Sequence, residues 1–194
     1  MNKKNFTVSS YINEHINILS KVSIEEVEVA LNLINKKFLE GKQIFVCGNG
    51  GSALTANHFI NDWNKMIYIA TKRKFRGISL SDNVGLITSF ANDISYDEIY
   101  SGQLKNLLNK GDLLIGISGS GNSENIIKAV DFANEQGANT LCLVGYDGGK
   151  LLSRCQYQVW IKSFDMQICE DLHFIFGHLV MKKLCSSPIH SEFK

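Results

Sequence analysis

A short polar segment, Ser118-Gly-Ser-Gly-Asn-Ser123, carries the residue types expected of a phosphate site. It lies between an apolar run and a helical pattern, and it contains three hydroxyls, one amide and two glycines. Glycines let backbone N–H groups converge on an anion, hydroxyls add donors, and the N-terminus of a following helix adds positive potential. The segment therefore predicts a phosphate site without a lysine. A plain strand-to-helix turn with an N-cap serine is the alternative interpretation.

Two common nucleotide motifs are absent here. The segment lacks the GxxxxGK spacing of ATP-binding loops, and Gly116-Ile-Ser-Gly119 lacks the GxGxxG spacing of dinucleotide sites. A second glycine-rich turn, Asn49-Gly-Gly-Ser52, follows the apolar run Ile44–Cys47, so strand–GNGGS–helix recurs later as strand–SGSGNS–helix. Ligands bind at the carboxyl ends of strands in open α/β sheets. We therefore expect one ligand to bridge the two turns.

Acid–base or metal-binding side chains occur on two predicted helices. His58 and Asp62 are four residues apart, so they share one helix face just beyond the first glycine turn. The last predicted helix adds Glu170, Asp171, His173 and His178. Histidines and carboxylates suit zinc or another divalent ion, whereas a hydrogen-bonded surface pair is the alternative for His58 and Asp62.

Helix geometry limits how these groups combine. Glu170 and His178 are eight residues apart, which is about 12 Å along a helix. Both reach one ion only if their side chains converge, if Glu170 lies at a frayed helix start, or if one of them comes from a second copy of the chain.

The elements that position these residues follow from hydrophobic periodicity. The pattern predicts strands at 44–47, 78–80, 113–118, 140–144 and 157–161, and helices at 8–20, 24–40, 53–66, 84–91, 95–108, 124–136 and 167–184. Ser23 with Glu26 and Ser95 with Glu98 fit capping boxes. Alternating strands and helices indicate an α/β protein in which helices cover both faces of a five-stranded parallel sheet. We expect residues 1–40 to form an N-terminal helical extension and 185–194 a loose tail.

Length and composition fit one domain. The chain has 194 residues, of which 44% are hydrophobic and 20% charged, and its net charge is +1. This charge gives no field for nucleic acid or an anionic membrane. A local basic cluster, Lys72, Arg73, Lys74 and Arg76, is typical of a solvated loop or, alternatively, of a helper for an anionic ligand.

Five cysteines without a CxxC pair indicate reduced thiols, and hence a cytoplasmic protein. The N-terminus has no apolar stretch of the signal-peptide type, and no apolar run approaches the roughly 18 residues of a membrane span, so no membrane association is expected.

Four segments together resemble a known family. They are GNGGSA with His58 beyond it, ANDISYDEIY at 91–100, LLIGISGSGNS at 113–123 and EDLHFIFGH at 170–178. The chain resembles sugar isomerase (SIS) domains and, among them, the phosphoheptose isomerases, over nearly its whole length. The resemblance implies a three-layer, flavodoxin-like SIS domain over 1–194, and a homotetramer with active sites at subunit interfaces.

The resemblance also implies roles for individual residues. The phosphate would be held by Ser118, Gly119, Ser120 and Ser123. The rest of the substrate would contact Asn49, Gly50, Gly51, Ser52, Asn92, Asp93 and Glu170. A zinc ion would be bound by His58, Asp62, Glu170 and His178, and the catalytic base and acid would be Asp62 and His178.

This chain departs from the family pattern at three places. Many members have glutamate in place of Asp62 and glutamine in place of Glu170. Aspartate is one methylene shorter, and Glu170 adds a charge that could tighten binding of a divalent ion. Many members also carry an arginine one turn after the base, where this chain has Lys65 and Met66.

The expected activity is conversion of sedoheptulose 7-phosphate to glycero-manno-heptose 7-phosphate through an enediol, for lipopolysaccharide or capsule heptose. A carboxylate and a histidine suit the proton transfers, and a metal could polarise the carbonyl. One alternative is a non-catalytic SIS module that binds a protein partner or senses a sugar phosphate. Another is an isomerase of a different sugar phosphate.

Overall fold

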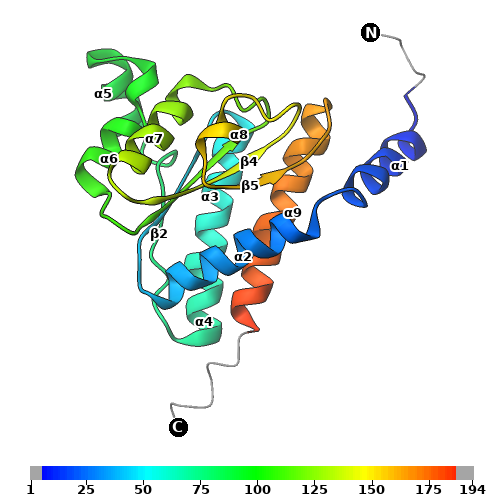
Figure 1. Ribbon diagram of the computed structural model, residues 1–194, viewed down its shortest axis with the longest axis horizontal. Helices are drawn as coiled ribbons and strands as arrows, with labels where there is room; N and C mark the ends of the chain where they lie inside the picture. The colour runs from blue at the N-terminus through cyan, green and yellow to red at the C-terminus, as the bar shows by residue number, and fades with distance from the viewer. Residues whose placement is uncertain (1–5, 187–194) are drawn as a thin grey trace.

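Five parallel strands form one sheet in the computed structural model, which describes residues 6–186 (Figure 1). The strands are β1 (Ile44–Gly48), β2 (Gly77–Ser79), β3 (Leu113–Ser118), β4 (Asn139–Val144) and β5 (Tyr157–Trp160). Their order across the sheet is β2-β1-β3-β4-β5, and every neighbouring pair is parallel. The predicted five-stranded parallel sheet is confirmed.

Helices cover both faces of the sheet because the central strands are apolar on both sides. Ile44 and Val46 enter one hydrophobic core, whereas Phe45 and Cys47 enter the other, as successive side chains of a strand do. One face carries α2 (Ile24–Leu39), α3 (Gly51–Asp62) and α9 (Met166–Cys185). The other carries α5 (Val84–Asp93), α6 (Ser101–Leu107), α7 (Glu124–Glu135) and α8 (Leu151–Arg154) (Figure 1). The three-layer α/β/α architecture is therefore confirmed.

The two N-terminal helices differ in how they pack. α2 contributes Ala30, Leu33, Ile34 and Phe38 to the core beneath the sheet. α1 (Val8–Leu19) has no buried residue and extends away from the sheet (Figure 1). The expected extension thus combines a helix that belongs to the core with one that does not.

The first predicted capping box forms only in part. Ser23 Oγ accepts a hydrogen bond from the backbone N–H of Glu26 at 3.2 Å. The Glu26 carboxylate does not return to the cap, because it accepts from Gln158 Nε2 at 2.9 Å and from the backbone N–H of Trp160 at 3.1 Å. The Glu26 carboxylate thereby accepts a hydrogen bond from a backbone N–H of the edge strand β5.

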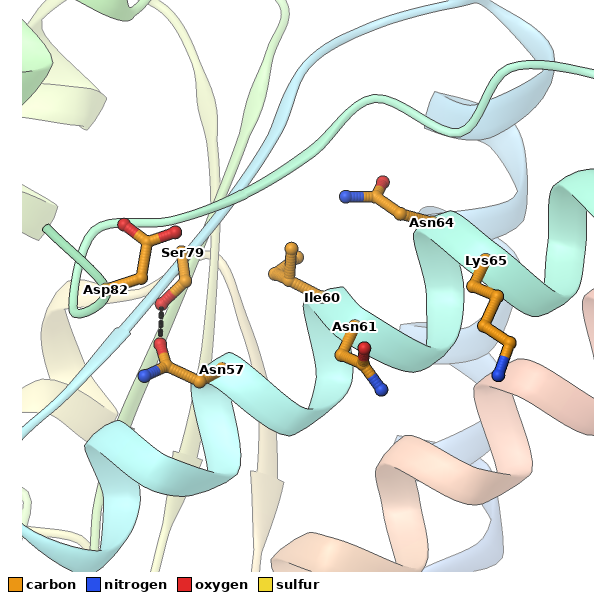
Figure 2. Close-up of a pocket in the computed structure, with 7 residues that line it drawn as sticks. All are labelled: Asn57, Ile60, Asn61, Asn64, Lys65, Ser79 and Asp82. Atoms are coloured by element: carbon orange, nitrogen blue, oxygen red, sulfur yellow. Dashed lines mark hydrogen bonds between the residues drawn. The ribbon is translucent and has the colours of Figure 1, made fainter.

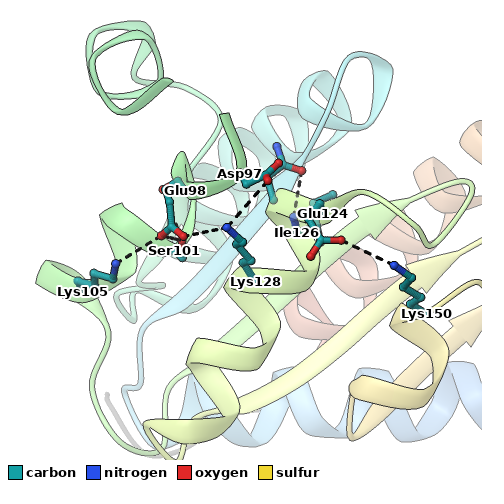
Figure 3. Close-up of polar contacts among 9 residues, drawn as sticks. Asp97, Glu98, Ser101, Lys105, Glu124, Ile126, Lys128 and Lys150 are labelled. Carbon is teal, nitrogen blue, oxygen red and sulfur yellow. Dashed lines mark hydrogen bonds and ion pairs between the residues drawn. The ribbon is translucent and has the colours of Figure 1, made fainter. Parts of the chain in front are cut away.

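The second predicted capping box is wrong. Ser95 makes no side-chain cap, and a 3₁₀ turn, η2 (Tyr96–Glu98), separates it from α6, which begins at Ser101. The Glu98 carboxylate binds Ser101 Oγ at 2.7 Å and Lys128 Nζ at 3.1 Å (Figure 3). Hydrogen bonds from Ser101 and Lys128 lower the pKa of Glu98 to about 2. Since Lys128 lies on α7, this ion pair fastens η2 to α7.

Two further differences concern the extent and number of the helices. The helix predicted to end near residue 66 continues from α3 through the π-helical η1 (Trp63–Ile67) into α4 (Tyr68–Thr71). The short α8 has no counterpart among the predicted elements. Residues 187–194 of the expected tail lie outside the described residues.

Among residues 6–186, no helix combines the length and apolarity needed to cross a membrane.

Candidate active site

The two glycine-rich turns lie side by side at the carboxyl edge of the sheet. One follows β1 and the other follows β3, and these strands are neighbours in which Gly48 pairs with Ile117. The strand order reverses direction between β1 and β3, and such a switch point is where open α/β sheets bind ligands. The turns share a cavity of about 320 Å³. It is lined by Asn49, Gly50, Gly51, Ser52, Ile117, Ser118, Gly119, Ser120, Ser123, Met166 and Glu170.

The serine-rich turn keeps its hydroxyls inside this cavity. Ser123 is the N-cap residue of α7, but its side chain makes no capping hydrogen bond. Its Oγ lies 3.2 Å from Ser118 Oγ instead. Gly121 has a φ of +65°, and its backbone N–H donates to Ser118 Oγ at 3.1 Å. Because the Ser123 hydroxyl is not used as a cap, the turn fits anion binding better than an ordinary strand-to-helix connection.

Glu170 lies against the start of α3. A Cβ atom on Gly51 would lie 2.7 Å from Glu170 Oε1, so a side chain there would displace this carboxylate. α3 begins at Gly51, and negative charge is favourable at a helix N-terminus. The carboxylate of Glu170 therefore occupies the cavity wall beside the first glycine turn.

His58, Asp62 and His178 form a compact cluster between α3 and α9. His58 Nε2 lies 3.1 Å from His178 Nε2 and 3.2 Å from Asp62 Oδ2, and His178 Nε2 lies 3.8 Å from Asp62 Oδ2. The Phe174 ring packs against both imidazoles, with centroids 4.4 Å from His58 and 5.2 Å from His178. Tetrahedral zinc with bonds of about 2.1 Å separates its ligand atoms by roughly 3.4 Å. The three side chains therefore fit a zinc site with three protein ligands.

Glu170 does not join this cluster within one chain. Among the described residues, the group of potential metal ligands contains His58, Asp62 and His178. Glu170 lines the cavity instead, eight residues before His178 on the same helix, α9. One chain thus brings together three of the four expected ligands.

Asn92 and Asp93 also lie apart from the cavity. They end α5, both are exposed, and Asn92 Nδ2 donates to Asp93 Oδ1 at 2.7 Å. Neither residue lines the cavity beside the two turns. Two tyrosines in the same segment, residues 91–100, do reach the site. The hydroxyls of Tyr96 and Tyr100 lie 3.3 and 3.2 Å from Asn49 Oδ1.

Sequence reasoning missed Tyr96, Tyr100 and Asn125, which all contact Asn49. Met166 in the cavity wall was also missed. The only sequence signal for Asn125 is its position in the first turn of the helix after Ser123.

His173 is a core residue. It is 1% exposed, and burial lowers its pKa to about 4, so the imidazole is neutral at physiological pH. It does not belong to the cluster of potential metal ligands.

A larger cavity of about 540 Å³ is lined by residues of α3, η1 and the edge strand β2, among them Asn57, Asn64 and Ser79 (Figure 2). Two of its asparagines, Asn57 and Asn64, hold the edge strand β2. Asn57 Oδ1 accepts from Ser79 Oγ at 2.5 Å, and the Asn64 amide exchanges two hydrogen bonds of 3.0 Å with the backbone of Gly77. None of the residues lining this cavity is a predicted site residue. Asn57 and Asn64 thus serve the sheet edge, whereas Asn61 Nδ2 donates to Asp62 Oδ1 at 3.3 Å.

Comparison with known proteins agrees with this geometry. The sequence model of the SIS domain family matches residues 10–145. A phosphoheptose isomerase from Aliarcobacter butzleri is 37% identical over 166 residues, covering 86% of this chain and 87% of that protein. One from Fusobacterium nucleatum is 38% identical over 181 residues, covering 90% and 91%. The structure of phosphoheptose isomerase from Neisseria gonorrhoeae aligns with a TM-score of 0.84 at 28% identity, covering 91% of this chain and 96% of that one. The chain therefore belongs to the SIS domain family and, within it, to the phosphoheptose isomerases.

Proposed function

We propose that this enzyme converts D-sedoheptulose 7-phosphate to D-glycero-D-manno-heptose 7-phosphate, supplying heptose for lipopolysaccharide or capsule synthesis. The observation that carries the proposal is the pairing of two features along one helix. The cavity with its serine turn lies at the start of α3, at Gly51, and the histidine–aspartate cluster begins at His58, seven residues or about 10 Å further on. An extended sugar phosphate suits such a separation between its phosphate and its reacting carbons.

Different residues of the site would bind different parts of the substrate. Ser118, Gly119, Ser120 and Ser123 would hold the phosphate with hydroxyl and backbone donors. Asn49, Gly50, Gly51, Ser52 and Glu170 would contact the sugar, and Asn92 and Asp93 would approach it in the assembled protein. Binding energy gained at the distant phosphate would then fix the reacting carbons against the catalytic groups.

Asp62 and His178 are the proposed base and acid. Asp62 would take the proton from C1 of the ketose and return it at C2, while His178 would move a proton between the two oxygens. Asp62 Oδ2 faces the histidines, whereas its Oδ1 accepts from Asn61 Nδ2 at 3.3 Å. The carboxylate therefore has a second oxygen outside the cluster that can accept a proton.

We propose zinc as the cofactor, held by His58, Asp62 and His178 of one chain. When bound, the ion would polarise the substrate carbonyl. Glu170 would complete the ligand set from a second copy of the chain, since in its own chain it lies about 12 Å along α9 from His178.

A homotetramer with interface active sites is part of this proposal. α1 supports it, because none of its residues is fully buried in its own chain and it exposes Val8, Ile12 and Ile16 by 69%, 51% and 60%. Apolar faces of this kind are normally covered by another subunit. We further propose a single SIS domain over residues 1–194 and a cytoplasmic location, the latter supported by five cysteines that are all free thiols.

Proton-exchange NMR tests the proposed reaction directly. The protein is incubated in D₂O with a panel of ketose phosphates of five, six and seven carbons, with and without a chelator. Exchange at C1 and appearance of the aldose should occur with the seven-carbon substrate and should stop with the chelator. Preferred turnover of a shorter ketose phosphate would mean that the enzyme's substrate is that shorter sugar. Binding of the whole panel without exchange would favour a non-catalytic module.

A further inference from the structure

The two turns of the active site are joined by a buried pair of amides. Asn49, in the first turn, donates from Nδ2 to Asn125 Oδ1 at 2.9 Å, and Asn125 Nδ2 donates back to Asn49 Oδ1 at 2.9 Å. Asn125 is 2% exposed and lies in the first turn of α7, directly after the serine-rich turn. A reciprocal amide pair has two parallel hydrogen bonds, so it fixes orientation as well as distance.

The backbone decides which way both amides face. The backbone N–H of Ile126 can only donate, and it is shared between Asn125 Oδ1 at 3.0 Å and the backbone oxygen of Ser123 at 3.1 Å. This identifies the oxygen of Asn125, so its Nδ2 must face Asn49. The oxygen of Asn49 is then committed to Asn125, and the hydroxyls of Tyr96 and Tyr100 lie within 3.3 Å of the same oxygen. The Asn49 amide is therefore held in one of its two orientations.

One hydrogen of Asn49 is left over by this arrangement. Nδ2 carries two hydrogens, and among residues 6–186 only Asn125 accepts from it. Asn49 also lines the cavity beside the phosphate turn. The fixed amide can thus present an N–H to the cavity while its oxygen is turned away.

We propose that Asn125 is a positioning residue, which locks the Asn49 amide so that it offers an N–H donor to a substrate oxygen. The identity of that substrate rests on the proposed function. An unlocked amide could present its oxygen instead, and would then face sugar oxygens without a donor. Asn125 itself lies outside the set of residues that line the cavity.

Tyr100 holds the backbone that carries Asn49. It is 2% exposed, its hydroxyl hydrogen-bonds the backbone oxygen of Gly48, and Ser81 Oγ donates to it at 3.2 Å. Burial raises the pKa of Tyr100 well above its ordinary value, so the hydroxyl keeps its proton and remains a donor. The side chain of Asn125 thereby holds the Asn49 amide, while the hydroxyl of Tyr100 holds the Gly48 backbone that precedes it.

A double-mutant cycle tests the proposal. Asn49→Ala, Asn125→Ala and the double variant are compared for kcat and KM with sedoheptulose 7-phosphate and for the Kd of inorganic phosphate. Asn125→Ala should lower kcat/KM about 10- to 100-fold with phosphate affinity unchanged, and it should have no further effect when Asn49 is already alanine. Asn125→Asp keeps the shape but loses the donor, so it should show the same loss if the alanine variant folds poorly.

Asn134→Ala is the matched control. Asn134 lies on the same helix, where it donates to the Arg154 backbone and accepts from Thr140 Oγ1, each at 2.9 Å. Its loss should change the Tm and leave kcat/KM within twofold of wild type. Additive effects of Asn49→Ala and Asn125→Ala, or an equal loss of kcat/KM in Asn134→Ala, would overturn the positioning role.

A measurement without substrate separates this inference from the proposed function. The ¹⁵N side-chain amide signal of Asn49, identified by its absence in Asn49→Ala, should exchange slowly with solvent in the wild type and at least tenfold faster in Asn125→Ala. This result supports the lock even if the protein does not turn over heptulose phosphate. Equal exchange in the two proteins contradicts it, whatever the substrate.

Discussion

The Nε2 atoms of His58 and His178 lie 3.1 Å apart, although 120 positions separate the two residues in the chain. Close packing of α3 on α9 brings them together. A Cβ on Gly177 would lie 2.0 Å from Cε1 of Phe59, and Trp63 Nε1 donates to the Gly177 backbone oxygen at 2.9 Å. Each of these contacts involves a residue next to a histidine or one turn from it. The missing side chain at Gly177 therefore sets the distance at which the histidines meet.

Gly177→Ala should push the two helices apart. We expect a loss of about 1–3 kcal/mol in the free energy of unfolding, because the added methyl overlaps a buried ring. We also expect weaker zinc binding, measured by equilibrium dialysis. Gly85→Ala is the control, since its closest neighbour is the Asn83 side chain at 3.3 Å. Unchanged zinc affinity in Gly177→Ala would show that the helix spacing does not set the cluster.

Ser123→Ala should weaken phosphate binding. Its hydroxyl makes no helix-capping hydrogen bond and faces Ser118 inside the cavity. Loss of one hydrogen bond to a charged group corresponds to about 10- to 100-fold in Kd for inorganic phosphate, measured by calorimetry. Ser153→Ala is the control, because that hydroxyl bonds the Lys150 backbone and lines no cavity beside the turns. Equal phosphate affinity in the two variants would argue for an ordinary turn.

His173 should make the fold sensitive to mild acid. Burial lowers its pKa to about 4 in the folded protein, whereas the unfolded chain titrates near the ordinary 6.5. Between these values the unfolded state binds more protons, so stability falls as pH decreases from about 6.5 to 4, by up to about 3 kcal/mol. Urea unfolding at several pH values measures this. His173→Leu should remove that part of the slope, and an identical slope in the variant would assign it to other groups.

Mixing two inactive variants tests whether a site combines two chains. Glu170→Ala keeps the His58–Asp62–His178 cluster, and His178→Ala keeps Glu170. If each site takes its cluster from one chain and Glu170 from another, co-refolding equal amounts should restore about a quarter of the sites. Activity and bound zinc are both measured. Recovery should fail if all four ligands belong to one chain.

The central strands could be predicted from sequence because their apolar runs are continuous. Ile44–Gly48 and Leu113–Ser118 are buried throughout, which leaves no other place for these runs than the middle of a covered sheet. The position of the two turns side by side followed from this prediction, since neighbouring parallel strands end at the same edge of the sheet. Helix starts that depend on local pairs were less predictable. Glu98 fits a capping box by spacing, yet Lys128, thirty residues away, binds its carboxylate.

The arrangement of the candidate site residues was predictable where neighbours in sequence are neighbours in space. His58 with Asp62 follows from helical spacing, and the serine turn is contiguous. The contact of Asn49 with Asn125 spans 76 positions and has no sequence signature. Asn92 and Asp93, taken from the family resemblance, lie on α5 away from the cavity, because the chain turns back to the site only at Tyr96 and Tyr100.

The most direct test of the account is deuterium incorporation at C1 of sedoheptulose 7-phosphate in D₂O, compared between wild type and Asp62→Asn. The variant keeps the size of the side chain but removes the proton acceptor. With an unchanged Tm and unchanged affinity for inorganic phosphate, we predict rapid exchange in the wild type and a loss of at least about 1,000-fold in the variant. Exchange at the wild-type rate in Asp62→Asn would contradict the assignment of Asp62 as the base.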